Sequence, residues 1–490
     1  MAQTATTSVG GPALQISGLD GSMVALEAAT LAQMSSRLSG RVLLPSDPGF
    51  EEAVLFWNGM IVKRPALVVQ PLFAGDVSEA VRFAREHGLL LSIKGGGHGL
   101  GGTATAEGGL MLDMSRMRQV VVDPDRRLAH VQSGCRLGDV DGATQARGLA
   151  TVLGSDADTG VAGLTLGGGF GWLSRRFGWA VDNLVEVEIV SASGELLRAA
   201  EDENAELFWA LRGGGGNFGV VTRFTFRLHE VGPTVTGGLM MWKAADAERV
   251  LEAYRRVTET APRELSVALS MRLAPQAARI PPALRGRPVV GILACHTGEA
   301  SAASRDLAPL RQIPAAVGAV TRRSYVEQQF VLGFPQPAGF HQYWKSEFLG
   351  TLSDSFLETY RSSAAALESP LSQLVLFQLG GAVSDRLEDA VAMGNRDAHY
   401  IFLAAGTWRA EDLHAADHLR RVRSAWQALR PYSLGGNYVN AQNADDGEDR
   451  LHEAYRASFD RLARVKAAYD ADNFFRVNRN ISPANTRREI

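Results

Sequence analysis

The chain has 490 residues and a formal net charge of −3; 46% of its residues are hydrophobic and 21% are charged. This length predicts roughly two to three domains, and the balanced charge lacks the basic excess that nucleic-acid binding requires. Two cysteines cannot form a disulfide framework. The first residues do not have the pattern of a secretion signal, and no apolar stretch is long enough to span a membrane. We therefore expect a cytoplasmic protein without nucleic-acid or membrane partners.

The first half of the chain predicts an α+β domain. Residues 1–39 are expected to form a partly disordered N-terminal extension. Beyond them, capping residues with apolar spacing predict helices, while apolar or alternating runs predict strands. The expected helices cover residues 46–54 and 75–88, and the expected strands cover residues 65–71, 110–113, 119–125, 128–132, 184–190 and 220–228.

The second half has a different pattern. Strand-like runs at residues 289–294, 373–379 and 399–404, with a helix over 244–257, predict an antiparallel sheet backed by helices. We expect this region to form the substrate domain. Residues 448–469 predict one long amphipathic helix, which is followed by a polar tail over 473–481.

Three glycine-rich loops give the chain its most specific signal. They lie at residues 93–100, 164–172 and 212–219, and the first contains His98. Glycine removes the Cβ atoms that keep an anion away from backbone N–H groups, so such loops form phosphate-binding nests. None is followed by the Gly-Lys-Ser/Thr of an NTPase, and the Rossmann spacing is absent. Three nests with one histidine predict a large dinucleotide, with a neutral imidazole as nucleophile toward its ring.

Six runs in order resemble the berberine-bridge-enzyme-like group of FAD-linked oxidases, which belongs to the vanillyl-alcohol-oxidase superfamily with a PCMH-type FAD-binding fold. The resemblance covers nearly the whole chain after residue 40 and rests on residues 94–98, 166–178, 182–183, 208–219, 435–440 and 469–476. It implies a two-part FAD domain, residues 40–235 and 435–490, around a substrate domain of residues 236–434.

The resemblance also implies a set of FAD-binding residues. His98 would carry FAD through an 8α-histidyl bond, a link that prevents cofactor loss and makes the flavin a better hydride acceptor. The pyrophosphate loop would be Lys94, Gly95, Gly96, Gly97, His98, Gly99 and Leu100. The flavin and ribityl chain would lie along Thr159, Gly160, Gly163, Gly167, Gly168, Gly169, Gly171 and Trp172. The adenine would lie near Val221, and the isoalloxazine near Tyr438, Asn440 and Asn478.

The chain departs from the family pattern at one decisive position. Bicovalent members carry a cysteine where this chain has Asp156, and a carboxylate cannot form the thioether, so we expect attachment through His98 alone. This counts against a carbohydrate oxidase. Cys135 lies outside that motif and is expected to be a small buried thiol. Thr159 replaces the valine of oxygen-reactive members, is close to it in shape, and is predicted to admit oxygen.

The expected activity is that of an FAD-dependent oxidase. A small secondary-metabolite-like substrate would pass a hydride to flavin N5, and O2 would be reduced to H2O2. The local run 158–172 is especially similar to the monocovalent branch that includes the enterocin polyketide oxidase-cyclase, so a flavin N5-oxide oxygenase or oxidative cyclase is an alternative. A dehydrogenase with another acceptor and a non-redox flavin scaffold are further alternatives. We expect no metal, and a monomer or homodimer.

The catalytic base is the least defined part of the expected site. Tyr438 comes with the flavin motif and is the preferred candidate, first as a flavin-side contact. Other polar residues of the substrate domain are weighed as bases but are expected to be structural: Tyr325, His341, Tyr343 and Gln378.

Overall fold

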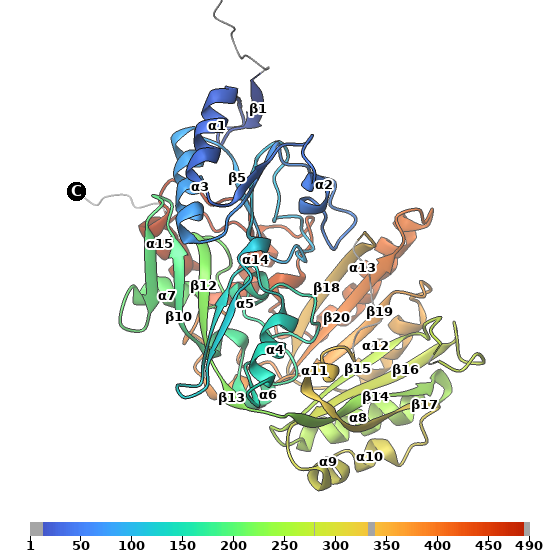
Figure 1. The fold of residues 1–490 in the computed structure, drawn as a ribbon. Coiled ribbons are helices and arrows are strands. Elements are labelled where there is room, and N and C mark those ends of the chain that lie inside the picture. Colours follow the sequence, from blue (N-terminus) through green and yellow to red (C-terminus); the bar gives the residue numbers. More distant parts are fainter. Residues whose placement is uncertain (1–12, 279, 332–338, 485–490) are drawn as a thin grey trace, which may run out of the picture.

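The computed structural model describes residues 13–278, 280–331 and 339–484, and it has the predicted α+β fold. Figure 1 shows two lobes. The N-terminal half and the C-terminal helices form one lobe, and the other is a large sheet with helices on its outer side. No helix in the described part of the chain has the length and apolar character of a membrane span.

A four-stranded sheet begins the first lobe. Its order is β3-β4-β6-β5, and β4, β6 and β5 run parallel. The elements around it are β1 (Leu14–Ser17), β2 (Met23–Leu26), α1 (Ala28–Arg37), β3 (Arg41–Leu43), α2 (Phe50–Ala53), β4 (Leu67–Gln70), α3 (Ala74–Glu86), β5 (Leu91–Lys94) and β6 (Leu110–Asp113). Gly88, with φ +62°, follows α3 as predicted for a helix end.

The N-terminal extension is more ordered than expected. Residues 14–37 form the β1-β2 hairpin and α1, while residues 1–12 lie outside the described residues. The apolar side chains of Ile16, Leu26 and Met34 are buried with Val77 and Val81 of α3. Burial of these side chains supplies the hydrophobic energy that orders the segment.

A five-stranded antiparallel sheet completes the first lobe, in the order β11-β10-β12-β8-β7. Its inner face packs on α7 and on the C-terminal α15 through one hydrophobic core. The elements are β7 (Val120–Asp123), β8 (Leu128–Gln132), α4 (Leu137–Gln145), β9 (Leu149–Ala150), α5 (Val161–Leu166), α6 (Ser174–Phe177), β10 (Leu184–Val190), β11 (Leu196–Ala200), α7 (Ala205–Leu211), β12 (Val220–Arg227) and β13 (His229–Glu230).

The second lobe is a seven-stranded antiparallel sheet with the order β17-β14-β16-β15-β19-β20-β18. Helices α8, α12 and α13 cover its outer face (Figure 1). The elements are β14 (Thr234–Lys243), α8 (Ala247–Thr260), β15 (Leu265–Leu273), β16 (Pro288–His296), α9 (Ala300–Asp306), α10 (Ala308–Arg311), β17 (Val317–Ser324), α11 (Tyr325–Gln328), β18 (His341–Leu349), α12 (Asp354–Ala365), β19 (Gln373–Gln378), β20 (Tyr400–Trp408) and α13 (Ala415–Leu429).

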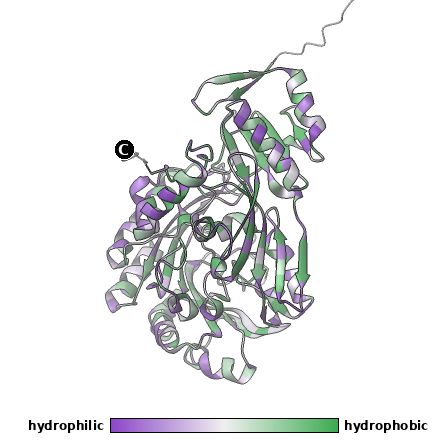
Figure 2. Ribbon diagram, turned by 90° about the vertical axis from the view of Figure 1, so that its left-hand side faces the viewer, coloured by the Kyte–Doolittle hydropathy of each residue, from purple (hydrophilic) through white to green (hydrophobic). Residues whose placement is uncertain are grey.

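The side chains of this sheet alternate between two cores. On β19, Leu374 and Leu376 pack under the helices, whereas Val375 and Phe377 point toward the first lobe. Figure 2 shows the strands mostly in the hydrophobic colour and the helices in mixed colours, as expected for buried strands and amphipathic helices. One face of the sheet is therefore left for contact with the first lobe.

The C-terminal segment returns to the first lobe and differs from the prediction in one respect. The long helix expected over 448–469 is two helices, α14 (Glu448–Tyr455) and α15 (Phe459–Tyr469), joined by a short 3-10 turn. The break lies at Arg456, whose φ is +48°. Its guanidinium contacts Glu388 at 3.3 Å and Asp397 at 2.9 Å, and these ion pairs hold the chain away from helical geometry.

Candidate cofactor site

The first glycine loop leaves β5 and runs against the start of α5. A Cβ atom on Gly96 would lie 2.4 Å from Cα of Gly160, so only glycine allows the two loops to touch. Gly97 has φ +72°. Within the described residues, the backbone N–H groups of residues 96–99 donate no hydrogen bond. Such N–H groups are suited to an anion.

Lys94 does not extend into this loop. Its ammonium group donates to the carbonyl oxygen of Ala53 at 2.5 Å and lies 5.4 Å from the ring of Phe56. Burial lowers the pKa of this lysine. Its side chain therefore holds α2 against β5 and packs beside the loop, where a Cβ atom on Gly97 would lie 3.1 Å from Cε of Lys94.

His98 ends the loop beside residues 156–158. Its pKa is lowered, mainly by burial, and the Asp156 carboxylate opposes that shift. Its ring also stacks on Trp57, with 5.2 Å between centroids and 13° between planes. A lowered pKa keeps the imidazole neutral near pH 7, which is the nucleophilic form.

The second glycine loop meets the C-terminal segment. A Cβ atom on Gly167 would lie 2.2 Å from Oδ1 of Asn440, and Gly168 and Gly169 have φ of +107° and +74°. The Asn440 amide donates to the Leu164 carbonyl at 3.0 Å and to the Tyr438 hydroxyl oxygen at 2.9 Å. Residues far apart in the sequence thus form one wall.

Tyr438 is buried in this wall. Burial raises its pKa to about 12, although hydrogen bonds from Asn440 and from the backbone of Gly169 oppose the shift. The ring of Phe170 lies edge-on to Tyr438 at 5.1 Å and to Phe377 of β19 at 5.4 Å. Phe170 therefore connects the wall with the open face of the sheet.

The third glycine loop is held by the C-terminal tail. Asn478 donates to the Gly216 carbonyl at 3.1 Å, and Asn217 donates to the Arg479 carbonyl at 3.1 Å. Oδ1 of Asn478 is buried and has no hydrogen-bond partner among the described residues. Val221 is buried at the start of β12, directly after this loop. Asn478 therefore contacts the third loop, apart from the pair formed by Tyr438 and Asn440.

The residues present fit FAD. The first loop offers donors for phosphate, the second loop and Tyr438 form a flat wall, and the third loop leaves a buried amide oxygen without a partner. Trp172 is buried close to this wall, and its carbonyl accepts a hydrogen bond from Ser266 of β15 at 2.7 Å. The predicted positions thus lie on connected segments.

Comparisons with known proteins agree with this geometry. The FAD binding domain family model matches residues 65–200, and the berberine and berberine-like model matches residues 437–482. The chain is 30% identical to (R)-6-hydroxynicotine oxidase of Paenarthrobacter nicotinovorans over 92% of its length and 99% of the relative. The chain belongs to the berberine-bridge-enzyme-like family of FAD-linked oxidoreductases.

Solved structures support the fold of this oxidoreductase. The crystal structure of 6-hydroxy-D-nicotine oxidase from Arthrobacter nicotinovorans is 28% identical, with a TM-score of 0.82 over 91% of this chain and 98% of the other. A berberine bridge enzyme variant is 19% identical, with a TM-score of 0.82 over 93% and 99%. The chain is thus an FAD-linked oxidoreductase with a PCMH-type fold.

Three of the four substrate-domain base candidates of this oxidoreductase point away from the FAD wall. Tyr343 is packed under the helices, where it donates to Asp445 at 2.9 Å, and His341 lies edge-on to Trp408. The Gln378 amide donates to the Thr258 carbonyl at 2.9 Å. Strand alternation places Gln378 on the face of β19 opposite to Val375 and Phe377.

The fourth base candidate, Tyr325, lies between the lobes. It is buried with Trp172, Leu293 and Cys295, and burial raises its pKa well above the ordinary value. A phenol in this state is not a base near neutral pH. The prediction that these four residues are structural agrees with their contacts.

The two cysteines of the oxidoreductase are buried thiols, as expected for Cys135. Burial raises the pKa of Cys135 and of Cys295 to about 12. The Cys135 thiol donates to the Gln119 carbonyl at 3.4 Å. Neither sulfur is therefore in the thiolate form that would react.

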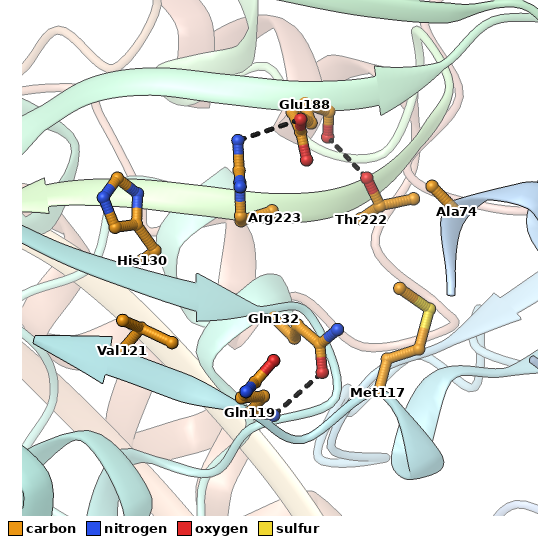
Figure 3. A pocket seen from close by; sticks show the side chains of 9 residues that line it. All are labelled: Ala74, Met117, Gln119, Val121, His130, Gln132, Glu188, Thr222 and Arg223. Carbon is orange, nitrogen blue, oxygen red and sulfur yellow. Dashed lines mark hydrogen bonds and ion pairs between the residues drawn. The ribbon is translucent and has the colours of Figure 1, made fainter. Parts of the chain in front are cut away.

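A cavity of about 170 Å³ lies on the outer face of the five-stranded sheet (Figure 3). Its charged groups are paired, because Arg223 contacts Glu188 at 2.9 Å. Gln132 accepts from the backbone N–H of Gln119 at 2.9 Å. None of the predicted FAD-binding residues lines this cavity, so it is separate from the site.

Sequence reasoning missed two aromatic residues of the site, Trp57 and Trp344. Their rings lie 5.6 Å apart at 90°, and Trp57 also covers His98. Trp57 follows α2 in a loop without a motif. Trp344 lies on the open face of β18, and strand alternation alone gives no indication of which face meets the cofactor.

Proposed function

We propose that this protein is an FAD-dependent oxidase of small, secondary-metabolite-like organic substrates, with FAD attached only through His98. The observation that carries the proposal is His98 itself. Its imidazole has a lowered pKa and lies at the end of a glycine loop with unused N–H groups, and its acidic neighbour is Asp156 where relatives with two links have a thiol.

His98 acts as the nucleophile in attachment. An imidazole nitrogen would bond to the 8α carbon of FAD, one N–H and one C–H bond would break, and the two electrons and two protons would pass to O2 as H2O2. When bound, FAD accepts a hydride at N5 from the substrate and passes two electrons to O2, which leaves as H2O2. The sole link through His98 leaves the cofactor edge at Asp156 without a covalent bond.

The open face of the sheet supports an organic substrate. Val375 and Leu403 present apolar side chains there, and Trp344 and Phe377 add aromatic surface. Ser270 donates to Gln373 at 2.9 Å on the same face and gives it a polar end. The name of the relative that oxidises (R)-6-hydroxynicotine also supports a small organic substrate.

Tyr438 acts as a hydrogen-bond donor in this proposal. Its oxygen accepts from Asn440, and its pKa of about 12 keeps the phenol protonated. The O–H would then be available to donate to a substrate or flavin atom. Thr159 is half-buried, and both its backbone groups are bonded, which leaves its compact side chain to line a path for O2.

The test combines detection of covalently bound flavin, by its yellow colour after acid precipitation, with measurement of H2O2 release. We expect the acid-precipitated protein to stay yellow and the peptide that holds His98 to carry the mass of FAD. His98→Ala should yield a colourless acid pellet. A substrate screen should release one H2O2 per substrate oxidised. A colourless wild-type pellet overturns the attachment, and turnover that is unaffected by removal of O2 overturns the oxidase.

A further inference from the structure

The imidazole of His98 is part of a chain of three aromatic rings that joins the two lobes. Trp57 stacks on His98 with centroids 5.2 Å apart and planes at 13°. Trp344 of β18 meets the other side of this pair, with its ring at 90° to Trp57 and 5.6 Å away. A substrate-domain ring thus supports the ring that covers His98.

The backbone of Trp57 is fixed on both sides. Its N–H donates to the Gly97 carbonyl at 3.1 Å, inside the glycine loop. Its carbonyl accepts from the N–H of Gly339 at 3.2 Å, in the segment that leads into β18. The indole ring is therefore carried by a backbone that moves only together with the loop beneath it.

Asn58 strengthens this connection. Its side chain is 2% exposed, and its Nδ2 donates to the carbonyls of Leu100 at 3.1 Å and Gln342 at 3.0 Å. Its Oδ1 accepts from the N–H of Gln342 at 2.9 Å and of Met60 at 3.1 Å. One buried amide thus joins the end of the histidine loop, at Leu100, to β18, and breaking these hydrogen bonds costs free energy.

Orientation is the property that attachment of FAD requires of His98. The imidazole must present one nitrogen lone pair to a single carbon atom, and correct alignment of two reacting groups contributes strongly to rate. His98 follows a run of three glycines and is only half-buried, so its own backbone restrains it weakly. A ring stacked on one of its faces hinders rotation about the Cβ–Cγ bond, because this rotation would carry the imidazole out of its plane.

We propose that Trp57 is a positioning residue for attachment of FAD to His98, and that Asn58 and Trp344 hold Trp57 in place. This inference rests on the proposed attachment through His98. Trp57 itself takes no proton and forms no bond to the cofactor. It raises the fraction of time in which the imidazole faces the carbon that it attacks.

The experiment compares Trp57→Leu with Trp57→Phe, which keeps a stacking ring. Each full-length protein is purified, incubated with excess FAD in air and acid-precipitated at intervals, and the covalent fraction is read from pellet absorbance and from the mass of the His98 peptide. Loss of the stack should slow attachment about two- to tenfold. Trp57→Phe should attach at nearly the wild-type rate.

Two further readouts separate positioning from folding. The melting temperature and the total amount of bound FAD, covalent plus non-covalent, should be unchanged in Trp57→Leu. Phe73→Leu is a matched control, because Phe73 is a half-exposed aromatic residue outside the site, and it should leave attachment unchanged.

The outcomes are distinct. Equal attachment rates in Trp57→Leu and the wild type, with FAD covalent in both, overturn the positioning role alone. A wild-type protein whose FAD is entirely removed by acid overturns the attachment and the positioning role together. The positioning role is also overturned if both Trp57→Leu and Trp57→Phe lose all FAD and melt at a lower temperature than the wild type. Trp57 would then serve folding.

Discussion

Tyr438 is a buried phenol. Asn440 donates to its oxygen at 2.9 Å, and burial raises its pKa to about 12. A phenol in this state gives a hydrogen bond more readily than it takes a proton. We therefore predict that Tyr438 serves as a hydrogen-bond donor.

Tyr438→Phe removes only this donor. We expect kcat to fall about 100- to 1,000-fold, the range seen when one oriented donor is lost. The content of covalent FAD should not change. Tyr360→Phe is the matched control, because Tyr360 is fully buried on α12 and its hydroxyl has no partner among the described residues. Equal kcat values in the two variants would contradict the donor role.

The charge of His98 depends on its surroundings. Burial lowers its pKa and Arg136 lowers it further, whereas Asp156 and Asp158 raise it. The neutral imidazole is the nucleophile, so attachment should speed up as pH rises through this pKa. Asp156→Asn removes a raising charge, and the midpoint of the attachment rate should therefore move to lower pH.

The measurement for this prediction is the rate of covalent FAD formation from pH 4.5 to 8. Asp123→Asn, at the last residue of β7, serves as control because Asp123 does not appear among the groups that shift the His98 pKa. A midpoint that stays in place, or that moves to higher pH, would refute the assigned influence of Asp156.

At the scale of elements, features set by the local sequence could be predicted, whereas features that depend on contacts between distant segments could not. Glycine runs identify their own loops, because φ of +72° at Gly97 and +74° at Gly169 is a property of single residues. The break at Arg456 could not be predicted, because its ion pairs with Glu388 and Asp397 involve another part of the chain. The stacking of Trp57 on His98 could not be predicted for the same reason.

Helix α15 contains a buried ion pair that anchors the C-terminal segment. The Lys466 ammonium donates to Asp470 at 2.6 Å, and also to the carbonyls of Asn217 at 2.7 Å and Phe475 at 2.9 Å. Burial lowers the pKa of Lys466, and Asp470 opposes this shift. The pair thus joins α15, the third glycine loop and the tail.

Lys466→Met should lower the free energy of unfolding by about 3 to 5 kcal/mol, because it leaves the Asp470 carboxylate buried without its cation. Urea denaturation measures this difference. Lys63→Met is the matched control, since Lys63 is exposed, and it should change the free energy by less than about 0.5 kcal/mol. A similar loss of unfolding free energy in both variants would show that the buried ion pair contributes no more to stability than the exposed Lys63.

At the scale of the whole molecule, the contacts between the lobes could not be predicted from the motifs. One such contact joins α4 of the first lobe to α11 of the second, where the Gln329 amide donates to Asp141 at 2.8 Å. Neither residue belongs to a motif. Asp141 is fully buried, and no cation pairs with it among the described residues.

The isolation of Asp141 makes stability depend on pH. Burial raises its pKa from 3.8 to about 7. The folded state therefore holds this proton more tightly than the unfolded state, so the contribution of Asp141 to stability falls as pH rises from about 4 to 7 and stays low above that. The difference corresponds to roughly 4 kcal/mol at most.

Asp141→Asn should remove this dependence, because an amide accepts the same hydrogen bond without a charge. We expect the variant to be more stable than the wild type at pH 8 and similar to it at pH 4.5, as measured by denaturation at both values. Asp76→Asn should have the opposite effect. The Asp76 carboxylate accepts hydrogen bonds from the N–H groups of Ser39, Gly40 and Leu72, each at 2.9 Å. These bonds use both carboxylate oxygens, and an amide has only one. Its loss should cost about 1 to 3 kcal/mol at pH 8. If Asp141→Asn also destabilised the protein at pH 8, the carboxylate would have to be stabilised at the lobe contact by more than the single amide of Gln329.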